Sequence, residues 1–291
     1  MKTNDPCIGV LGARCSVGSS LIPILATRGK VVAFSRHPRP GHSHDLVEWA
    51  STPGPLGDNS QDLHQIDLWI SLLPIWILRD ILPYLAAMGA KRIVAMSSTS
   101  VLAKQDSPDP RERELAVRLA EGEAALLDWA AGNDIEVAIL RPTMIYGNGR
   151  DANLCAIAKM IRTFGFFPVI GNASGLRQPI HADDLASACA VAITIPQVGK
   201  IYTLSGGEVL TYREMLVRLF TNLGKPVRIL SLPSLLFELI LPLINLIPRY
   251  RNWTVGMAQR MNSDQAFPHT DAYNDLDFRP RNFELRPEDL P

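Results

Sequence analysis

The chain has 291 residues, 47% of them hydrophobic and 20% charged, and its 29 lysines and arginines balance 29 aspartates and glutamates. This zero net charge argues against a nucleic-acid-binding protein, because such proteins carry a surplus of cations that displaces counterions from phosphates. The apolar fraction is sufficient for a hydrophobic core and excludes a disordered chain. Since single cores stop growing near about 250–300 residues, we expect one structural unit.

The first forty residues predict one βαβ unit, with a strand at 7–11, a glycine turn at 12–18, a helix at 19–27 and a strand at 31–35. Further strands are expected at 46–49, 67–73, 92–96 and 135–140, and helices at 79–88 and 112–131. Strands that alternate with helices predict an α/β fold, a Rossmann-like doubly wound parallel sheet. We assign it to residues 1–150.

Residues 151–291 are expected to form a small substrate-binding portion interleaved with the sheet. It should contain helices at 154–163, 182–192 and 212–223 and a strand at 201–204. Its longest apolar stretch, residues 229–248, is interrupted by Glu238 and by prolines, which argues against a membrane span. We interpret it as a buried helix pair, or as a surface in peripheral contact with a membrane, supported by Arg249, Arg251 and Trp253.

The cysteines indicate the compartment. Cys7, Cys15, Cys155 and Cys189 lie far apart, without metal-ligand spacing or a disulfide framework. The polar N-terminus does not resemble a signal peptide. We therefore expect a cytoplasmic protein, either free or at the inner face of the cytoplasmic membrane. His42, His44 and Asp45 lack a fourth ligand nearby, so no metal site is predicted.

The glycine turn lies where a dinucleotide-binding turn is expected, between the first strand and the first helix. Gly12 allows the tight turn, Gly18 allows close packing of helix and sheet, and the helix N-terminus faces the pyrophosphate. Cys15 replaces the middle glycine of the usual spacing. The turn residues expected to contact the cofactor are Gly12, Arg14, Cys15, Ser16, Val17 and Gly18. The alternative is a tight turn without a ligand.

The residue after the second strand indicates which dinucleotide is bound. A protein selective for NAD places an acidic residue there, whereas this chain has Arg36, which is suited to a 2′-phosphate. Arg14 provides a second cation near the same phosphate, unless its side chain is only solvated. The sequence therefore predicts NADPH as the cofactor.

Five motifs together resemble the extended short-chain dehydrogenase/reductase superfamily, which contains nucleotide-sugar epimerases, dehydratases and reductases. The motifs are the glycine turn, Ser97-Ser98-Thr99, Leu140-Arg141-Pro142-Thr143-Met144-Ile145-Tyr146-Gly147, Arg177-Gln178-Pro179-Ile180-His181-Ala182-Asp183-Asp184 and Tyr202-Thr203-Leu204-Ser205-Gly206-Gly207. The resemblance also implies cofactor contacts from Leu72, Leu73, Pro74 and Pro142.

The resemblance implies a catalytic serine at Ser98, assisted by Thr99. The superfamily's Tyr-x-x-x-Lys pair, aligned through Glu123, falls on Leu115 and Leu119, so the usual proton donor is missing. Two substitutes are open, Lys104 and Tyr146. The alternatives are a solvated loop lysine and a packing tyrosine.

Substrate contacts follow from the same resemblance. Arg177 matches the arginine that binds the nucleotide diphosphate, and Met144 replaces an asparagine that touches it. Asn148 and Arg260 are candidates to compensate. His181 is expected to order its turn and Asp184 to cap the following helix.

A finer resemblance is to bacterial reductases that convert UDP-4-keto-6-deoxy-N-acetylglucosamine in O-antigen, and hence lipopolysaccharide, biosynthesis. It rests on segments that include Phe164-Gly165-Phe166-Phe167-Pro168 and Met261-Asn262-Ser263-Asp264. It implies a UDP-linked nucleotide-sugar substrate, in a monomer or homodimer. Two alternatives stay open: a non-catalytic NADP(H)-binding subunit or sensor, and a nucleotide-sugar epimerase.

Overall fold

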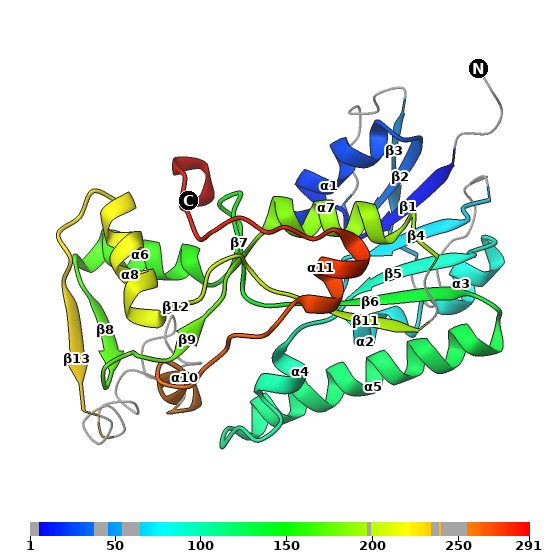
Figure 1. The fold of residues 1–291 in the computed structure, drawn as a ribbon. Helices are drawn as coiled ribbons and strands as arrows, with labels where there is room; N and C mark the ends of the chain where they lie inside the picture. The colour runs from blue at the N-terminus through cyan, green and yellow to red at the C-terminus, as the bar shows by residue number, and fades with distance from the viewer. Residues whose placement is uncertain (1–5, 38–45, 54–64, 197–198, 234–238, 240–254) are drawn as a thin grey trace.

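The computed structural model describes residues 6–37, 46–53, 65–196, 199–233, 239 and 255–291 (Figure 1). Its centre is a sheet of seven parallel strands in the order β11-β6-β5-β4-β1-β2-β3. The strands are β1 (Cys7–Leu11), β2 (Lys30–Ser35), β3 (Val47–Ser51), β4 (Leu68–Ser71), β5 (Arg92–Met96), β6 (Glu136–Pro142) and β11 (Lys200–Leu204). The expected Rossmann-like fold is confirmed.

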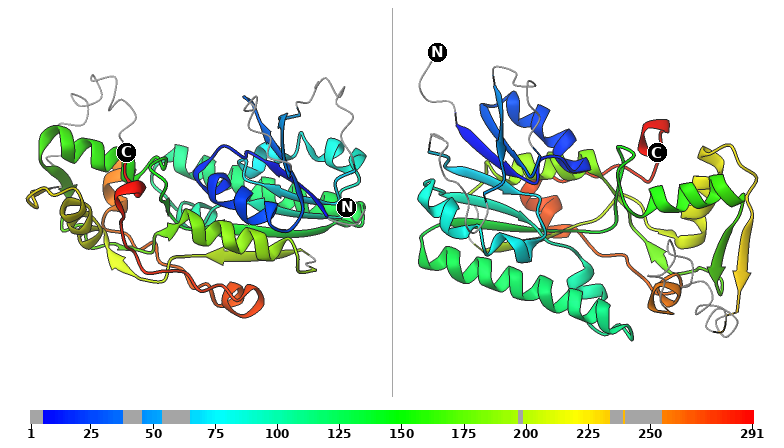
Figure 2. Two further views of the ribbon diagram at one scale, coloured as in Figure 1. Left: turned by 90° about the horizontal axis from the view of Figure 1, so that it is seen from above. Right: turned by 180° about the vertical axis from the view of Figure 1, so that it is seen from behind.

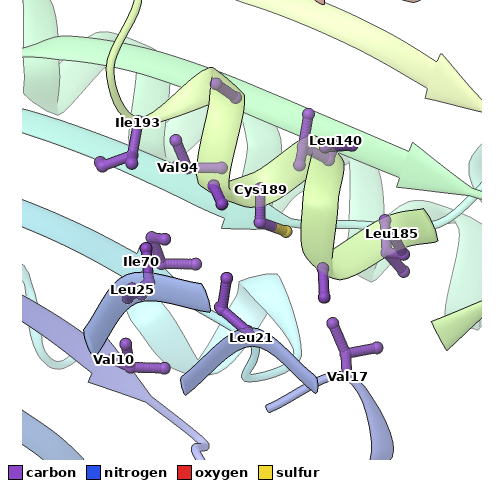
Figure 3. Close-up of a cluster of buried hydrophobic side chains, with 14 of the residues drawn as sticks. Val10, Val17, Leu21, Leu25, Ile70, Val94, Leu140, Leu185, Cys189 and Ile193 are labelled. Atoms are coloured by element: carbon purple, nitrogen blue, oxygen red, sulfur yellow. The ribbon is translucent and has the colours of Figure 1, made fainter. Parts of the chain in front are cut away.

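Helices cover both faces of this sheet, which explains why its central strands are continuously apolar (Figures 1 and 2). On one face α1 (Ser16–Ala26) packs against α7 (Ala182–Ala192) over a core that includes Val10, Leu21 and Cys189 (Figure 3). The other face carries α2 (Ile75–Leu78), α3 (Leu82–Ala87), α4 (Ser100–Ala103) and α5 (Pro110–Gly132).

The remaining elements form a smaller region with its own core at the end of the molecule away from the N-terminus (Figure 1). Its helices are α6 (Leu154–Phe164), α8 (Tyr212–Asn222) and α10 (Val255–Arg260). Its short strands pair as β7 (Ile145–Tyr146) with β10 (Ile180–His181), β9 (Leu176–Arg177) with β12 (Leu210–Thr211), and β8 (Phe167–Ile170) with β13 (Ile229–Leu232). Beyond them, α11 (Thr270–Leu276) returns to contact β11 and α7, and η2 (Pro287–Asp289) follows. Residues beyond 150 thus contribute to both regions.

Two local expectations were wrong. The helix expected at 79–88 covers only α3, which begins at Leu82 with Pro83 in its first turn, and the short helix α2 before it was not expected. The stretch expected to open a buried helix pair begins instead with strand β13, whose residues pair with β8. Most of the rest of that stretch, and His42, His44 and Asp45, lie outside the described residues. Among the helices described, none has the length and apolar character needed to cross a bilayer.

Candidate functional site

A cavity of about 490 Å³ opens at the carboxyl ends of β1, β4, β5 and β6. Ligands of open parallel sheets bind at this edge, because the loops that follow the strands converge there. The cavity brings together predicted residues that are widely separated in the sequence. These are Cys15, Ser16, Val17, Leu72, Ser98, Thr99, Lys104, Pro142 and Arg260.

The glycine turn has the geometry that dinucleotide binding requires. Gly12 has φ +73°, in the left-handed region, and a Cβ there would lie 3.1–3.3 Å from Leu73 and the Leu72 backbone. A Cβ on Gly18 would lie 2.2 Å from the carbonyl oxygen of Ala13. Cys15, with φ −73°, needs no glycine, and its Sγ accepts a hydrogen bond from the Gly18 amide at 3.3 Å.

The N-terminus of α1 therefore opens toward the cavity through Ser16 and Val17. The first amides of a helix have no intrahelical partners and bind anions, so this turn fits a pyrophosphate. The residues present thus fit a bound dinucleotide.

Two arginines, one in the turn and one beside it, lie outside the cavity lining. Arg36 is exposed directly after β2, and exposed Arg14 donates from Nη1 to the carbonyl of His37 at 3.0 Å. The amide of Ala13 donates to the carbonyl of Phe34 at 3.1 Å, which joins the turn to the end of β2. Both cations therefore lie beside the glycine turn. Leu73 and Pro74 also lie outside the cavity; Leu73 packs on the core, and Pro74 precedes α2.

The serine-rich end of β5 supplies one hydroxyl that is available for a ligand. Ser98 Oγ accepts from the amide of Ser100 at 3.1 Å, and its own O–H has no partner among the described residues. Thr99 is buried, and its hydroxyl donates to the carbonyl of Pro142 at 3.1 Å. Ser98 therefore presents a hydrogen-bond donor to the cavity, and Thr99 fixes the strand end.

Beneath this strand end lies a buried network that the sequence analysis missed. Ser97 donates to Glu123 Oε1 at 2.5 Å, and Arg141 donates to the same oxygen from Nε at 2.9 Å. Glu123 lies on the buried stripe of α5, with Ala116, Leu119, Leu126 and Ala130. The sequence did contain a signal for this network, because Glu123 is an acidic residue at a position where the helical spacing predicts an apolar side chain.

Lys104 lines the cavity at the C-cap of α4, and its side chain is 19% exposed. Burial, and secondly the positive charge of Arg260, lower the pKa of Lys104 to about 8. Its Nζ lies 4.0 Å from Glu112 Oε1, and Arg260 also forms an ion pair with Glu112. The cavity therefore contains an amine whose pKa is lowered toward neutral pH.

The positions of the missing catalytic pair are packing positions. Leu119 is 3% exposed within the core between α5 and the sheet, and half-buried Leu115 packs against the same core. Neither residue lines the cavity. At both positions the chain therefore has an apolar packing contact.

Tyr146 lies outside the cavity and packs in the smaller region. Its ring makes edge-to-face contacts with His181 at 5.0 Å and Phe283 at 4.9 Å, and its hydroxyl donates to the carbonyl of Glu284 at 3.3 Å. Burial raises its pKa. These contacts agree with the alternative interpretation, in which Tyr146 is a packing residue and not a proton donor.

Arg177 and Asn148 also lie outside the cavity. Arg177 is 5% exposed, and its guanidinium donates to the carbonyls of Leu176 at 2.7 Å and Ser263 at 2.9 Å, and to that of Arg260. It thereby holds the segment that carries Arg260. Asn148 donates to the Ser16 carbonyl at 3.1 Å, at the start of α1.

Asp184 does not cap helix α7, so the expectation for this residue was wrong. His181 is the N-cap of α7, because its Nδ1 accepts from the amide of Asp183 at 3.1 Å. Its Nε2 contacts the buried Asp289 at 3.0 Å, so His181 orders the turn as expected. Asp184 instead accepts two hydrogen bonds from Arg281, both at 2.9 Å. No cluster of three or more metal-ligating side chains occurs within the described ranges.

Sheet, glycine turn and strand-end serine together define a dinucleotide-binding fold of the short-chain dehydrogenase/reductase type. Residues 75–205 match the model of the NAD-dependent epimerase/dehydratase family. This match supports the resemblance to the superfamily that was inferred from the motifs.

Individual proteins are more distant. The chain is 28% identical over 155 residues to the uncharacterized protein y4nG of Sinorhizobium fredii, an alignment that covers 50% of this chain and 39% of that protein. It is 25% identical over 162 residues to a UDP-glucose 4-epimerase of Vibrio cholerae, over 52% of this chain and 49% of the epimerase. The alignments therefore span half or less of these relatives.

Among solved structures, the dTDP-glucose 4,6-dehydratase DesIV of Streptomyces venezuelae, crystallised with NAD and TYD bound, is similar with a TM-score of 0.72. The two are 16% identical, and the superposition covers 95% of this chain and 92% of DesIV. At this identity the likeness concerns the fold.

Proposed function

We propose that the protein is an NADPH-dependent reductase that acts on the 4-keto group of a UDP-linked 6-deoxy-N-acetylhexosamine, in the cytoplasm, for surface-polysaccharide synthesis. The observation that carries the proposal is that one cavity joins the N-terminus of α1 to Ser98 and Lys104. An anion-binding helix end, a hydroxyl donor and a titratable amine are the groups that reduction of a ketone needs.

The cofactor half of the cavity is assigned to NADPH. Gly12 and Gly18 leave room for the pyrophosphate at the start of α1, and Leu72 and Pro142 line the same space. Arg36, with Arg14 beside it, supplies the positive charge for a 2′-phosphate. When bound, the dinucleotide supplies the hydride that reduces the carbonyl.

The substrate half is assigned to the keto sugar. Ser98 donates a hydrogen bond to the keto oxygen and stabilises the negative charge that develops on it. Lys104 supplies the proton, and Arg260, which lines the cavity, contacts the diphosphate. Thr99, Arg177 and Asn148 act indirectly, by fixing respectively the end of β5, the Arg260 segment and the start of α1.

The test is NADPH oxidation with UDP-4-keto-6-deoxy-N-acetylglucosamine. We expect Ser98→Ala and Lys104→Ala each to lower turnover by about 100-fold, while the NADPH dissociation constant changes little, because both groups act on the sugar oxygen. The matched control is Lys91→Ala, which removes an exposed lysine that pairs with Asp67 at 2.8 Å. Full activity of both variants would refute these roles.

A nucleotide-sugar epimerase is the second candidate, favoured by the similarity to the Vibrio cholerae UDP-glucose 4-epimerase. Such an enzyme interconverts two sugars without net consumption of NADPH and retains its dinucleotide. Release of NAD from the denatured protein, with interconversion of UDP-sugars, would favour it. Binding of NADPH without either reaction would favour a non-catalytic subunit or sensor, a role compatible with Leu115 and Leu119.

A further inference from the structure

The first turn of α5 contains a buried acid, Glu112, that lies behind the cavity wall. Glu112 is 7% exposed and occupies the apolar stripe of the helix, one turn before Ala116. It does not line the cavity, whereas Lys104 and Arg260 do. A buried carboxylate is stable only when it is paired and hydrogen-bonded, so its partners indicate its role.

Glu112 has three polar partners. Its Oε1 lies 4.0 Å from Lys104 Nζ and pairs with Arg260, and its Oε2 accepts from Ser107 Oγ at 2.8 Å. Ser107 in turn donates its amide to the Lys104 carbonyl at 3.2 Å, and its Oγ accepts from the amide of Asp109 at 3.2 Å. The turn between α4 and α5 therefore holds the acid and the amine at a fixed separation.

We propose that Glu112 is a positioning residue that keeps Lys104 charged and directed at the keto oxygen, in place of the tyrosine and lysine that this chain lacks. The inference rests on the proposed function, in which Lys104 is the proton donor. Glu112 acts through Lys104 and contacts no substrate atom.

In the proposed reaction, Lys104 donates the proton that completes the reduction of the ketone. A hydride from the dihydronicotinamide adds two electrons to the carbonyl carbon, and the carbonyl oxygen becomes an alkoxide. An N–H bond of Lys104 then breaks as the O–H bond of the product forms, which leaves a neutral amine and an alcohol. The amine regains a proton from water, and the adjacent carboxylate favours its charged form.

Four other charged groups lie around this position. Arg260 on α10 opposes the Lys104 charge, whereas Asp109, the N-cap of α5, favours it. Asp151 lines the same cavity ahead of α6, and Arg113 donates to the Ser107 carbonyl at 2.6 Å. Glu112 lies within ion-pair distance of both Lys104 and Arg260.

The test is the pH dependence of acetylation of Lys104 in the full-length protein, because only the neutral amine reacts. Competitive labelling with acetic anhydride, read by mass spectrometry, gives the pH midpoint of each lysine, with exposed Lys225 as the internal reference. We expect a midpoint near 8 in the natural protein. In Glu112→Gln it should fall by about one pH unit or more, because an adjacent opposite charge typically shifts a pKa by about 1–3 units.

Three variants make the result decisive. Glu114→Gln removes the same charge from an exposed position two residues away and should leave the midpoint unchanged. Glu112→Asp retains the charge and should restore most of the shift. Arg260→Gln removes the opposing cation and should raise the midpoint. An unchanged midpoint in Glu112→Gln, or in Arg260→Gln if the former does not fold, would overturn the inference.

Turnover distinguishes this inference from the proposed function. If the natural protein reduces the keto sugar, the fall of kcat at high pH should move to lower pH in Glu112→Gln. If the natural protein reduces no keto sugar, the proposed function fails. The labelling midpoints still decide whether Glu112 controls Lys104.

Discussion

The two ends of the cavity are built by different means. At the cofactor end, the backbone forms the site, through the left-handed Gly12 and the close approach of Gly18 to Ala13. At the opposite end, side chains form it, and they include Lys104 at the end of α4, Asp151 before α6 and Arg260 at the end of α10. A backbone site tolerates few residue types, whereas a side-chain site can change its residues while the fold is retained. Because of this difference, the geometry of the glycine turn can be retained while the side chains at the opposite end change.

The largest expected effect comes from placing the superfamily's lysine and tyrosine at positions 119 and 115. Leu119→Lys, alone or with Leu115→Tyr, should destabilise the protein by about 3–5 kcal/mol, because it buries an unpaired ammonium. Urea denaturation measures this. Val117→Lys is the matched control, since that residue is 53% exposed on the same helix. A stable double variant with higher reductase activity would show that these positions reach the site.

The second prediction tests the cofactor end. Gly18→Ala should weaken NADPH binding by about 100-fold, because the added Cβ lies 2.2 Å from the Ala13 carbonyl and must displace the turn. Quenching of protein fluorescence by NADPH gives the dissociation constant. Gly132→Ala is the control, since a Cβ there has no heavy atom within 4 Å. Equal affinities of the two variants would mean that the turn does not hold the cofactor.

The same contrast explains what the sequence could predict. The parallel sheet, the glycine turn and Ser98 follow from local patterns, namely apolar runs, glycine spacing and a strand-end serine, and most expected elements lie within a few residues of the observed ones. The opposite end of the cavity brings together Lys104 and Arg260, which are more than 150 positions apart in the sequence. Such a contact arises from tertiary packing and leaves no local periodicity.

Some of the missed features did leave a signal. Glu112 and Glu123 lie on the apolar stripe of one helix, where an acid requires a buried partner, although the partners themselves were not predictable. Arg177 and Tyr146 were assigned by motif alone. The structure places the first among backbone carbonyls and the second among aromatic rings, because the returning C-terminal segment packs over both.

The smallest expected effect comes from Arg36, the exposed side chain to which we assign the choice of NADPH over NADH. Arg36→Ala should weaken NADPH binding by about tenfold and leave NADH binding unchanged, because only NADPH carries the 2′-phosphate. The residue is exposed, so the difference should shrink as salt screens the charge. Titrations of both dinucleotides at low and at high ionic strength measure it. Arg111→Ala, at an exposed arginine in the first turn of α5, controls for the loss of one cation. Equal weakening of NADH and NADPH would place Arg36 against a part that the two dinucleotides share, and the preference for NADPH would then have to come from Arg14.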